Sequence, residues 1–256
     1  MPAVILAGGL GSRLQEETVS RPKPMVEIGQ RPILWHIMKS FSHYGVRRFI
    51  ICLGYRGYVI KEYFANYFLH NTDVTFGFDD NTVDYHGANV EPWKVSLIDT
   101  GEMSMTGGRL GRVREHLDPA KPFFMTYGDG VADVDIEALF KFHNDHGRSA
   151  TMTVVRPPGR FGAVALDGEC VESFVEKPTS AGGYINGGFF VLEPRVLDLI
   201  SGDATVWEHE PLNTLSDSGD LVAYRHDAFW KPMDTLRERN ELEALWASGD
   251  APWKVW

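Results

Sequence analysis

Short hydrophobic runs alternate along this chain with segments in which hydrophobic residues recur at helical spacing. The runs contain few charged positions, which is typical of β-strands buried on both faces; they cover residues 2–8, 47–54, 122–130, 150–157 and 185–194. The helical segments cover residues 33–45, 58–71, 135–147 and 235–249. Because strands and helices alternate, the pattern predicts an α/β fold with a mainly parallel, mixed and twisted sheet and helices on both faces.

One stretch, residues 73–101, departs from this rhythm. Alternating and polar runs replace the helical pattern there, so we expect a small β excursion from the main sheet. No linker rich in proline, glycine or serine divides the chain. We therefore expect a single domain over residues 1–256, with residues 235–256 as a C-terminal helix and tail. In that tail, Trp253 and Trp256 need cover, either from the body of the chain or from another subunit.

Composition narrows the class of ligand. The chain has 256 residues, a net charge of −10 and no basic run, which argues against nucleic acid as a partner. The two cysteines, Cys52 and Cys170, are too few for a disulfide framework. Neither an apolar stretch long enough to cross a bilayer nor a charged leader is evident, so we expect a cytoplasmic protein that does not bind membranes.

Residues 3–14, "AVILAGGLGSRL", join an apolar strand to a glycine-rich turn that ends on Arg13. Backbone N–H groups in such a turn can face an anionic ligand. The dinucleotide fingerprint G-x-G-x-x-G starts at Gly9 and Gly11, but Leu14 stands at its third glycine position, and the P-loop pattern is absent. A nucleotide loop of another kind and a glycine turn made for packing both remain open.

Two further motifs add charge to this loop. In "RPKPM", residues 21–25, prolines on both sides hold Lys23 in a rigid segment, and with Arg13 it would suit a polyphosphate; the alternative is a pair of solvated cations. In "YGDGVAD", residues 127–133, Asp129 directly follows an apolar strand, where a carboxylate can bind Mg²⁺. An ordinary Asp-Gly turn is the alternative, and Asp133 and Asp135 are interpreted as capping or solvated charges.

These motifs resemble those of the sugar-1-phosphate nucleotidyltransferases. The shared stretches are "LAGGLGSRL", "RPKPM", the aspartate after an apolar strand, "EKP" at 176–178 and "NGG" at 186–188. Longer stretches are similar to the glucose-1-phosphate cytidylyltransferase group of that family, namely "GYVIKEYFANYFLH", "EPWKVSLIDTGEMSMTGGRL", "PPGRFGA" and "FWKPMDTL". The resemblance spans the chain from Met1 to Trp256 and implies a Rossmann-like nucleotidyltransferase fold.

The resemblance also implies a reaction. It is Mg²⁺-dependent transfer of a cytidylyl group from CTP to α-D-glucose 1-phosphate, which gives CDP-glucose and pyrophosphate for deoxysugar or O-antigen precursor synthesis. CTP and glucose 1-phosphate would be the binding partners, and the chain would form a homo-oligomer, with a hexamer as one expected size. Since the sugar phosphate is already ionised, catalysis needs positioning and cations rather than a general base.

Residue roles follow from the same resemblance. The nucleotide-binding residues would be Leu6, Ala7, Gly8, Gly9, Gly11, Ser12, Arg13, Lys23, Ser104, Thr106, Gly107, Arg109 and Gly128. Arg13, Lys23 and Asp129 would be catalytic, with Arg13 on the β- and γ-phosphates and Lys23 near the α-phosphate. Asp129 and Asp234 would bind the metal. The sugar phosphate would contact Glu176, Lys177, Asn186 and Gly187.

Two positions that differ from the wider family indicate which nucleotide base is used. Ser12 stands where many relatives carry threonine, and Asp234 is followed directly by Thr235, the form found in cytidylyltransferases, which favours CTP. Uridylyl or thymidylyl transfer is the main alternative. A non-catalytic nucleotide sensor on the same fold is a second, and an NAD-dependent oxidoreductase, opposed by Leu14, is a third.

Other candidate residues have structural interpretations. His143 and His146 share a helical face but lack a third metal ligand nearby. The aromatic segment 55–68 could stack on bases, yet core or subunit packing explains it more simply. Arg156 and Arg160 flank a loop and are left unassigned.

Overall fold

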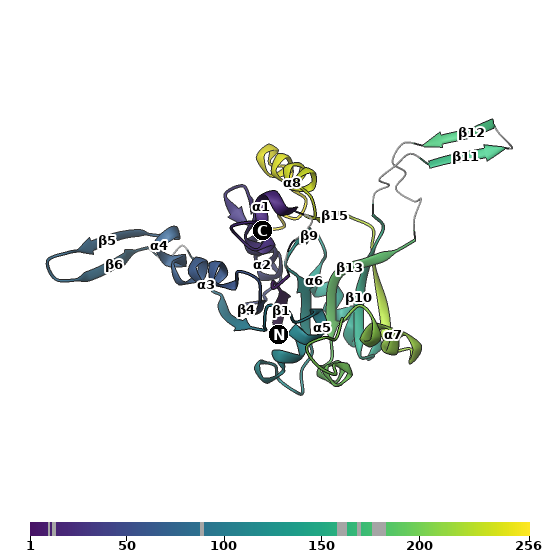
Figure 1. Cartoon of the computed structure of the whole chain (residues 1–256), viewed down its shortest axis with the longest axis horizontal. Coiled ribbons are helices and arrows are strands. Elements are labelled where there is room, and N and C mark those ends of the chain that lie inside the picture. Colours follow the sequence, from purple (N-terminus) through teal and green to yellow (C-terminus); the bar gives the residue numbers. More distant parts are fainter. Residues whose placement is uncertain (10, 12–13, 88–89, 158–162, 168–169, 176–182) are drawn as a thin grey trace.

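The computed structural model describes residues 1–9, 11, 14–87, 90–157, 163–167, 170–175 and 183–256, and only the backbone for residues 15–16, 163–167 and 170–175. A seven-stranded sheet with the order β14-β10-β13-β8-β1-β4-β7 forms its centre (Figure 1). Its strands are β1 (Pro2–Leu6), β4 (Arg48–Leu53), β7 (Lys94–Asp99), β8 (Phe123–Tyr127), β10 (Ala150–Val155), β13 (Ile185–Leu192) and β14 (Leu221–His226). Neighbouring strands are parallel except where β13 runs antiparallel to β8 and β10. The predicted mainly parallel, mixed sheet is confirmed.

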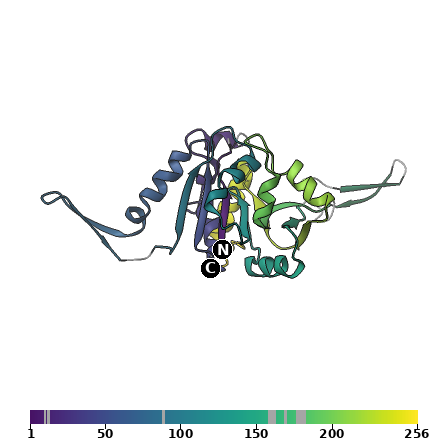
Figure 2. The ribbon, with the colours of Figure 1, turned by 90° about the horizontal axis from the view of Figure 1, so that it is seen from below.

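Side chains of the central strands alternate between two hydrophobic cores, as the period of two in a strand requires. In β1, Ala3 and Ile5 face one core, whereas Val4 and Leu6 face the other. Helices cover both cores, which confirms the prediction of helices on both faces (Figure 2). The helices on the first core are α2 (Ile33–His43), α3 (Gly57–Ala65), α6 (Ile136–His146) and α8 (Leu236–Ser248), and those on the second are α5 (Thr106–Arg112), η4 (Pro194–Leu199) and α7 (Glu210–Asp217).

The remaining elements are short. Helical turns occur at α1 (Gln15–Thr18), η2 (Lys23–Met25), α4 (Tyr67–Asn71) and η3 (Arg114–His116). Small antiparallel pairs join β2 (Glu27–Ile28) to β3 (Arg31–Pro32), β9 (Gly130–Ala132) to β15 (Trp230–Pro232), and β11 (Ala163–Asp167) to β12 (Cys170–Val175). The helix expected over residues 58–71 is divided at Asn66, which separates α3 from α4.

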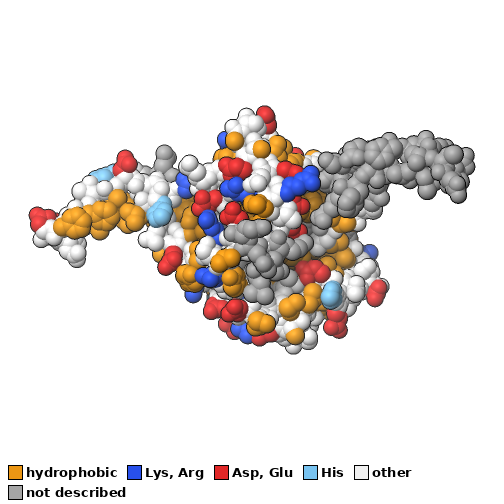
Figure 3. All heavy atoms as spheres, turned by 45° about the horizontal axis from the view of Figure 1, so that its top comes forward, with side chains coloured by type: hydrophobic (Ala, Val, Ile, Leu, Met, Phe, Trp, Pro, Cys, Tyr) orange, Lys and Arg blue, Asp and Glu red, His pale blue; other side chains and the backbone are white. Residues whose placement is uncertain are grey.

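The expected excursion over residues 73–101 has two parts. Strands β5 (Asp73–Gly77) and β6 (Thr82–His86) form an antiparallel hairpin that projects from the body as an arm (Figure 1). Strand β7, in contrast, pairs in parallel with β4 and is the edge strand of the main sheet, so this part of the stretch is not an excursion. Hydrophobic side chains gather on the hairpin arm (Figure 3), where Phe78 is 94% exposed and Phe76 is 47% exposed.

The body of the chain covers the tail tryptophan that the sequence left open. Trp253 is fully buried, stacks on Phe229 and Trp246, and donates an Nε1–H hydrogen bond to Nδ1 of His36 over 3.3 Å. Trp256 is half-buried and lies edge-on to Trp35. A second subunit is therefore not needed to bury Trp253. No helix in the described part of the chain combines the length and apolar character needed to cross a membrane.

Candidate active site

A cavity of about 410 Å³ opens at the carboxyl ends of β1 and β8. This is the edge of a parallel sheet at which ligands bind in α/β folds. Segments distant in sequence line the cavity, namely Leu6, Ala7, Gly8, Gly9, Gly11, Lys23, Pro24, Glu102, Met103, Ser104, Met105, Thr106, Arg109, Tyr127, Gly128 and Asp129. The structure thus brings together the glycine loop, Lys23 and Asp129 around one hollow.

At one position, Gly11, the glycine loop has a left-handed backbone conformation that favours glycine. Gly11 has φ +63°, in the left-handed region, and its carbonyl accepts a 3.0 Å hydrogen bond from the N–H of Leu14. At Gly8 the requirement is space, since a Cβ there would lie 2.2 Å from the Arg109 guanidinium. The glycines therefore set both the course of the loop and its contact with Arg109.

Arg109 is buried beside this loop and bonds to neutral groups. Its guanidinium donates to the carbonyls of Gly8 and Leu53 at 2.9 and 3.1 Å, and to those of Gly101 and Glu102 at 2.7 and 3.0 Å. It also donates to the Thr100 hydroxyl over 3.0 Å. Burial lowers the pKa of Arg109 below its ordinary value. Arg109 ties the glycine loop to the end of β4 and to the segment that precedes α5.

Lys23 is held differently, by two carboxylates. Its Nζ lies 2.8 Å from Asp129 and 2.5 Å from Asp234. Burial by itself would lower the pKa of Lys23, but the charge and hydrogen bond of Asp129, together with those of Asp234, raise it above its ordinary value. Pro24 fixes the backbone next to Lys23 by packing on Gly128, where a Cβ would approach Pro24 Cγ to 2.9 Å. The lysine is thus positioned at the turn that carries Asp129.

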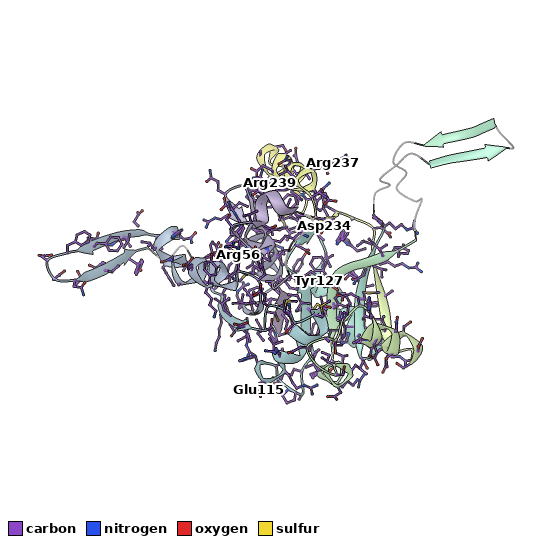
Figure 4. The ribbon with its side chains drawn as sticks, viewed as in Figure 1. Arg56, Glu115, Tyr127, Asp234, Arg237 and Arg239 are labelled. Atoms are coloured by element: carbon purple, nitrogen blue, oxygen red, sulfur yellow. The ribbon has the colours of Figure 1, made fainter. Side chains whose placement is uncertain are left out.

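The same two carboxylates fit a magnesium ion. Asp129 follows β8, and Asp234 lies between β15 and α8 (Figure 4), yet both contact one nitrogen atom, so they are close enough to bind one cation. Mg²⁺ prefers one or two carboxylates, with phosphate oxygens and water as its remaining ligands. The Asp129 side chain is 37% exposed and lines the cavity, whereas the Asp234 side chain is 15% exposed and is not among the residues that line it. Within the described residues, no three or more His, Cys, Asp or Glu side chains gather as a metal site.

A polar chain runs along the wall of the cavity from Tyr127. The Tyr127 hydroxyl donates to Glu208, and Thr106 Oγ1 donates to the same carboxylate over 2.6 Å. Asn186 Nδ2 lies 3.4 Å from the Tyr127 hydroxyl oxygen. Burial, followed by the charge of Glu208, raises the pKa of Tyr127 well above its ordinary value, so the phenol stays protonated. Asn186, one of the residues predicted to contact the sugar phosphate, thereby adjoins the cavity through Tyr127.

The other predicted site residues fall into two groups. Gly107 and Gly187 are described but do not line the cavity: a Cβ on Gly107 would meet the Thr205 carbonyl oxygen at 2.8 Å, and one on Gly187 would meet Val155 Cγ1 at 2.8 Å. Ser12, Arg13, Glu176 and Lys177 lie outside the residues whose side chains are described. Their roles stay predictions.

Sequence reasoning missed the carboxylate of Glu208 and the phenol of Tyr127. Glu208 lies 81 residues from Tyr127 and 102 residues from Thr106 in the sequence, so no local spacing could have connected them. Tyr127 had one usable signal, since it stands immediately before the turn that contains Asp129.

Comparisons with known proteins show the family of the chain. The nucleotidyl transferase family profile matches residues 2–217. A glucose-1-phosphate cytidylyltransferase of Salmonella typhi is 61% identical over the full length of both chains. A probable glucose-1-phosphate cytidylyltransferase of Bacillus subtilis is 41% identical, also over both full lengths. Among solved structures, HddC from Yersinia pseudotuberculosis superposes with a TM-score of 0.69 at 25% identity, covering 96% of this chain and 99% of its own. The chain belongs to the nucleotidyl transferase family.

Proposed function

We propose that this protein is a glucose-1-phosphate cytidylyltransferase. It transfers the cytidylyl group of CTP to glucose 1-phosphate and releases pyrophosphate. The observation that carries this conclusion is the 61% identity, without a terminal overhang on either chain, to the Salmonella typhi protein of that name. The cavity supports it, because a glycine loop, a buried lysine and Asp129 line it, and Asp234 contacts the same lysine.

The reaction joins two anions, so the site needs positive charge where the phosphates meet. A phosphate oxygen of the sugar phosphate attacks the α-phosphorus of CTP, a new P–O bond forms, and the bond to the β-phosphate oxygen breaks with release of pyrophosphate. The nucleophile is already ionised, so no side chain has to remove a proton. We propose that Lys23 stabilises the negative charge that gathers on the α-phosphate, and that Arg13 binds the β- and γ-phosphates.

The remaining roles follow the walls of the cavity. The nucleotide would lie over Leu6–Gly9 and Gly11 and against Ser104, Thr106, Arg109 and Gly128, whereas Asn186, with Glu176 and Lys177, would contact the sugar phosphate. Asp129 and Asp234 would bind Mg²⁺, which, when bound, neutralises phosphate charge and orients the leaving group. The protein's own net charge of −10 makes such local cations necessary.

The test is pyrophosphate release from glucose 1-phosphate with CTP, UTP, dTTP, GTP and ATP in parallel, each with Mg²⁺ and with EDTA. We expect release that depends on Mg²⁺ and is fastest with CTP. Faster release with UTP or dTTP would keep the reaction class and overturn the base. Absence of release with every nucleotide, alongside measurable CTP binding, would favour a nucleotide sensor.

The proposal extends to the assembly, the location and the pathway of the protein. A homo-oligomer, with a hexamer as one size, is supported by the hairpin arm, whose exposed Phe76 and Phe78 stack on each other away from the body. Light scattering coupled to gel filtration measures its mass. A cytoplasmic location and use of the product for deoxysugar or O-antigen precursors complete the proposal.

A further inference from the structure

The ammonium of Lys23 contacts the two carboxylates that we propose as magnesium ligands. Nζ bonds to Asp129 and to Asp234, and only 9% of the Lys23 side chain is exposed. An ammonium and a divalent cation both need these carboxylate oxygens, so the two cations compete for one position. A metal ion that binds here must first displace Lys23.

Nucleotide phosphates bound over the glycine loop would offer Lys23 a second set of acceptors. Its backbone is held by the prolines on either side and by the packing of Pro24 on Gly128. The glycine loop is adjacent, since a Cβ on Gly11 would lie 3.4 Å from the Lys23 Cβ. Lys23 and the loop line the same cavity, and a lysine has a flexible four-carbon stem that can turn its charge between neighbouring anions.

We propose that Lys23 is a displaceable counter-ion that makes magnesium binding depend on the nucleotide. Its ammonium occupies the carboxylate pair until nucleotide phosphates draw it away, and the pair then accepts the metal. The inference rests on the proposed function in one respect, namely that a nucleotide binds over the glycine loop. It follows that the protein alone binds a divalent cation weakly, and that phosphate and cation strengthen each other's binding.

Charge explains why the lysine matters in both states. With Lys23 in place, the Lys23–Asp129–Asp234 group carries one net negative charge, whereas without the ammonium two carboxylates face each other unscreened. The ion pair therefore stabilises the protein without nucleotide and holds the carboxylates in the arrangement that the metal requires. The same pairing lowers the affinity for a free cation.

The experiment titrates Mn²⁺, a paramagnetic substitute for Mg²⁺, into the nucleotide-free full chain and measures bound ion by electron paramagnetic resonance. We expect Lys23→Gln to bind Mn²⁺ at least about tenfold more tightly than the parent protein, since two charge-assisted hydrogen bonds no longer have to be broken. Equal affinity in the parent protein and in Lys23→Gln would overturn the proposal.

Three variants locate and control the effect. Lys39→Gln removes a lysine from a different carboxylate, Glu91, and should leave Mn²⁺ affinity unchanged. Adding Asp129→Asn to Lys23→Gln should abolish the gain, and a gain that survives would mean that the ion binds elsewhere. If circular dichroism shows that Lys23→Gln does not fold, Lys23→Met removes the charge while its unbranched chain keeps the packing of the stem, and carries the same prediction.

A second titration tests the link to phosphate, with cytidine monophosphate as the probe and cytidine as its phosphate-free control. In the parent protein, cytidine monophosphate should tighten Mn²⁺ binding severalfold, and cytidine should not. In Lys23→Gln the gain should be smaller, because no ammonium remains to be drawn away. An equal gain in both proteins would mean that the phosphate acts only as a metal ligand, which would overturn the coupling.

The outcomes distinguish a failure of the counter-ion role from a failure of the proposed function. If the parent protein makes CDP-glucose but Lys23→Gln binds Mn²⁺ no better, the counter-ion role is wrong and the activity stands. If no nucleotide supports pyrophosphate release and cytidine monophosphate has no effect, the nucleotide link is lost together with the proposed function.

Discussion

Two buried cations border the same cavity, and their partners differ in kind. Arg109 donates to four backbone carbonyls and a hydroxyl, all neutral and all part of the fold. Lys23 donates to two carboxylates, those of Asp129, which lines the cavity, and of Asp234. A backbone carbonyl cannot leave a folded loop, whereas a carboxylate can exchange one cation for another. Arg109 therefore sets the shape of the site, and Lys23 is available for its chemistry.

The largest effect is expected on replacing Asp129, one of the two carboxylates that contact Lys23. Asp129→Asn removes a carboxylate from Lys23 and from the proposed metal site, so turnover should fall about 10³-fold, equivalent to several kcal/mol of lost transition-state stabilisation. The fold should persist, because the side chain is 37% exposed. Steady-state pyrophosphate release measures the loss. The matched control is Asp133→Asn, which lies after the other end of β9 and should keep normal turnover. Near-normal turnover of Asp129→Asn at saturating Mg²⁺ would remove Asp129 from the mechanism.

Replacing Arg109, whose partners are fixed parts of the fold, should lower the stability of the protein. Arg109→Lys leaves several buried carbonyls without a donor, because an ammonium has at most three N–H groups and lacks the planar fork. We expect the free energy of unfolding to fall by about 3 to 4 kcal/mol, measured by urea denaturation. Arg112→Lys, at an exposed pair with Asp203, should leave it essentially unchanged. If Arg109→Lys were as stable as the parent protein, the shape-setting role would be wrong.

His36 offers a pH test of a buried basic group with neutral partners. Its Nε2 lies 2.8 Å from the Ile28 carbonyl oxygen, and burial lowers its pKa to about 4. Because the pKa is lower in the folded state than the ordinary 6.5, the unfolded chain binds the extra proton first, and stability present above pH 6.5 is lost as the pH falls toward 4. The loss should approach about 3 kcal/mol.

The measurement is urea denaturation at a series of pH values for the parent protein and for His36→Gln. The pKa values of His143 and His146 are also lowered by burial, so they contribute to the slope in both proteins. Only the difference between the two slopes belongs to His36. Parallel slopes would show that His36 does not resist protonation.

The smallest effect on activity is expected on removing the Tyr127 hydroxyl, which donates a hydrogen bond to Glu208. Tyr127→Phe removes the hydrogen bond to Glu208 and leaves the ring in place. We expect kcat/KM to fall about fivefold, which corresponds to about 1 kcal/mol. Thr106→Val removes the other donor to Glu208 and should cost a similar factor. A thousandfold loss of kcat/KM in Tyr127→Phe would mean that the phenol takes part in the reaction and would contradict the expected order of effects.

Much of the fold could be predicted because strand burial leaves a clear pattern. The runs at β1, β4, β8, β10 and β13 are apolar on both faces, and Gly147 ends α6 with φ +62°. Helix α5 could not be predicted, since its sequence "TGGRLGR" has three glycines and little periodicity. It forms there because Gly107 and Gly108 pack against the backbone of residues 203–205, where a Cβ would clash at 2.8 and 2.3 Å. That reason is tertiary and invisible in a local window.

The candidate site shows the same division. The glycine loop, Lys23 and Asp129 could be singled out from their own neighbours in the sequence, and the family resemblance added Asp234. That one ammonium bridges both aspartates could not be read from the sequence, because the contacts join residues 106 and 211 positions apart. Glu208 was missed for the same reason. Local patterns identified the chemical groups, and only the fold determined which of them touch.

The contact between Trp253 and His36 joins residues 217 positions apart. A ribosome releases the first of these residues long before the second, so helix α2 exposes its tryptophan-binding surface throughout synthesis. Trp253 then completes the hydrophobic core that also contains Ile28 of β2. This part of the core therefore cannot close during synthesis until residue 253 has left the exit tunnel.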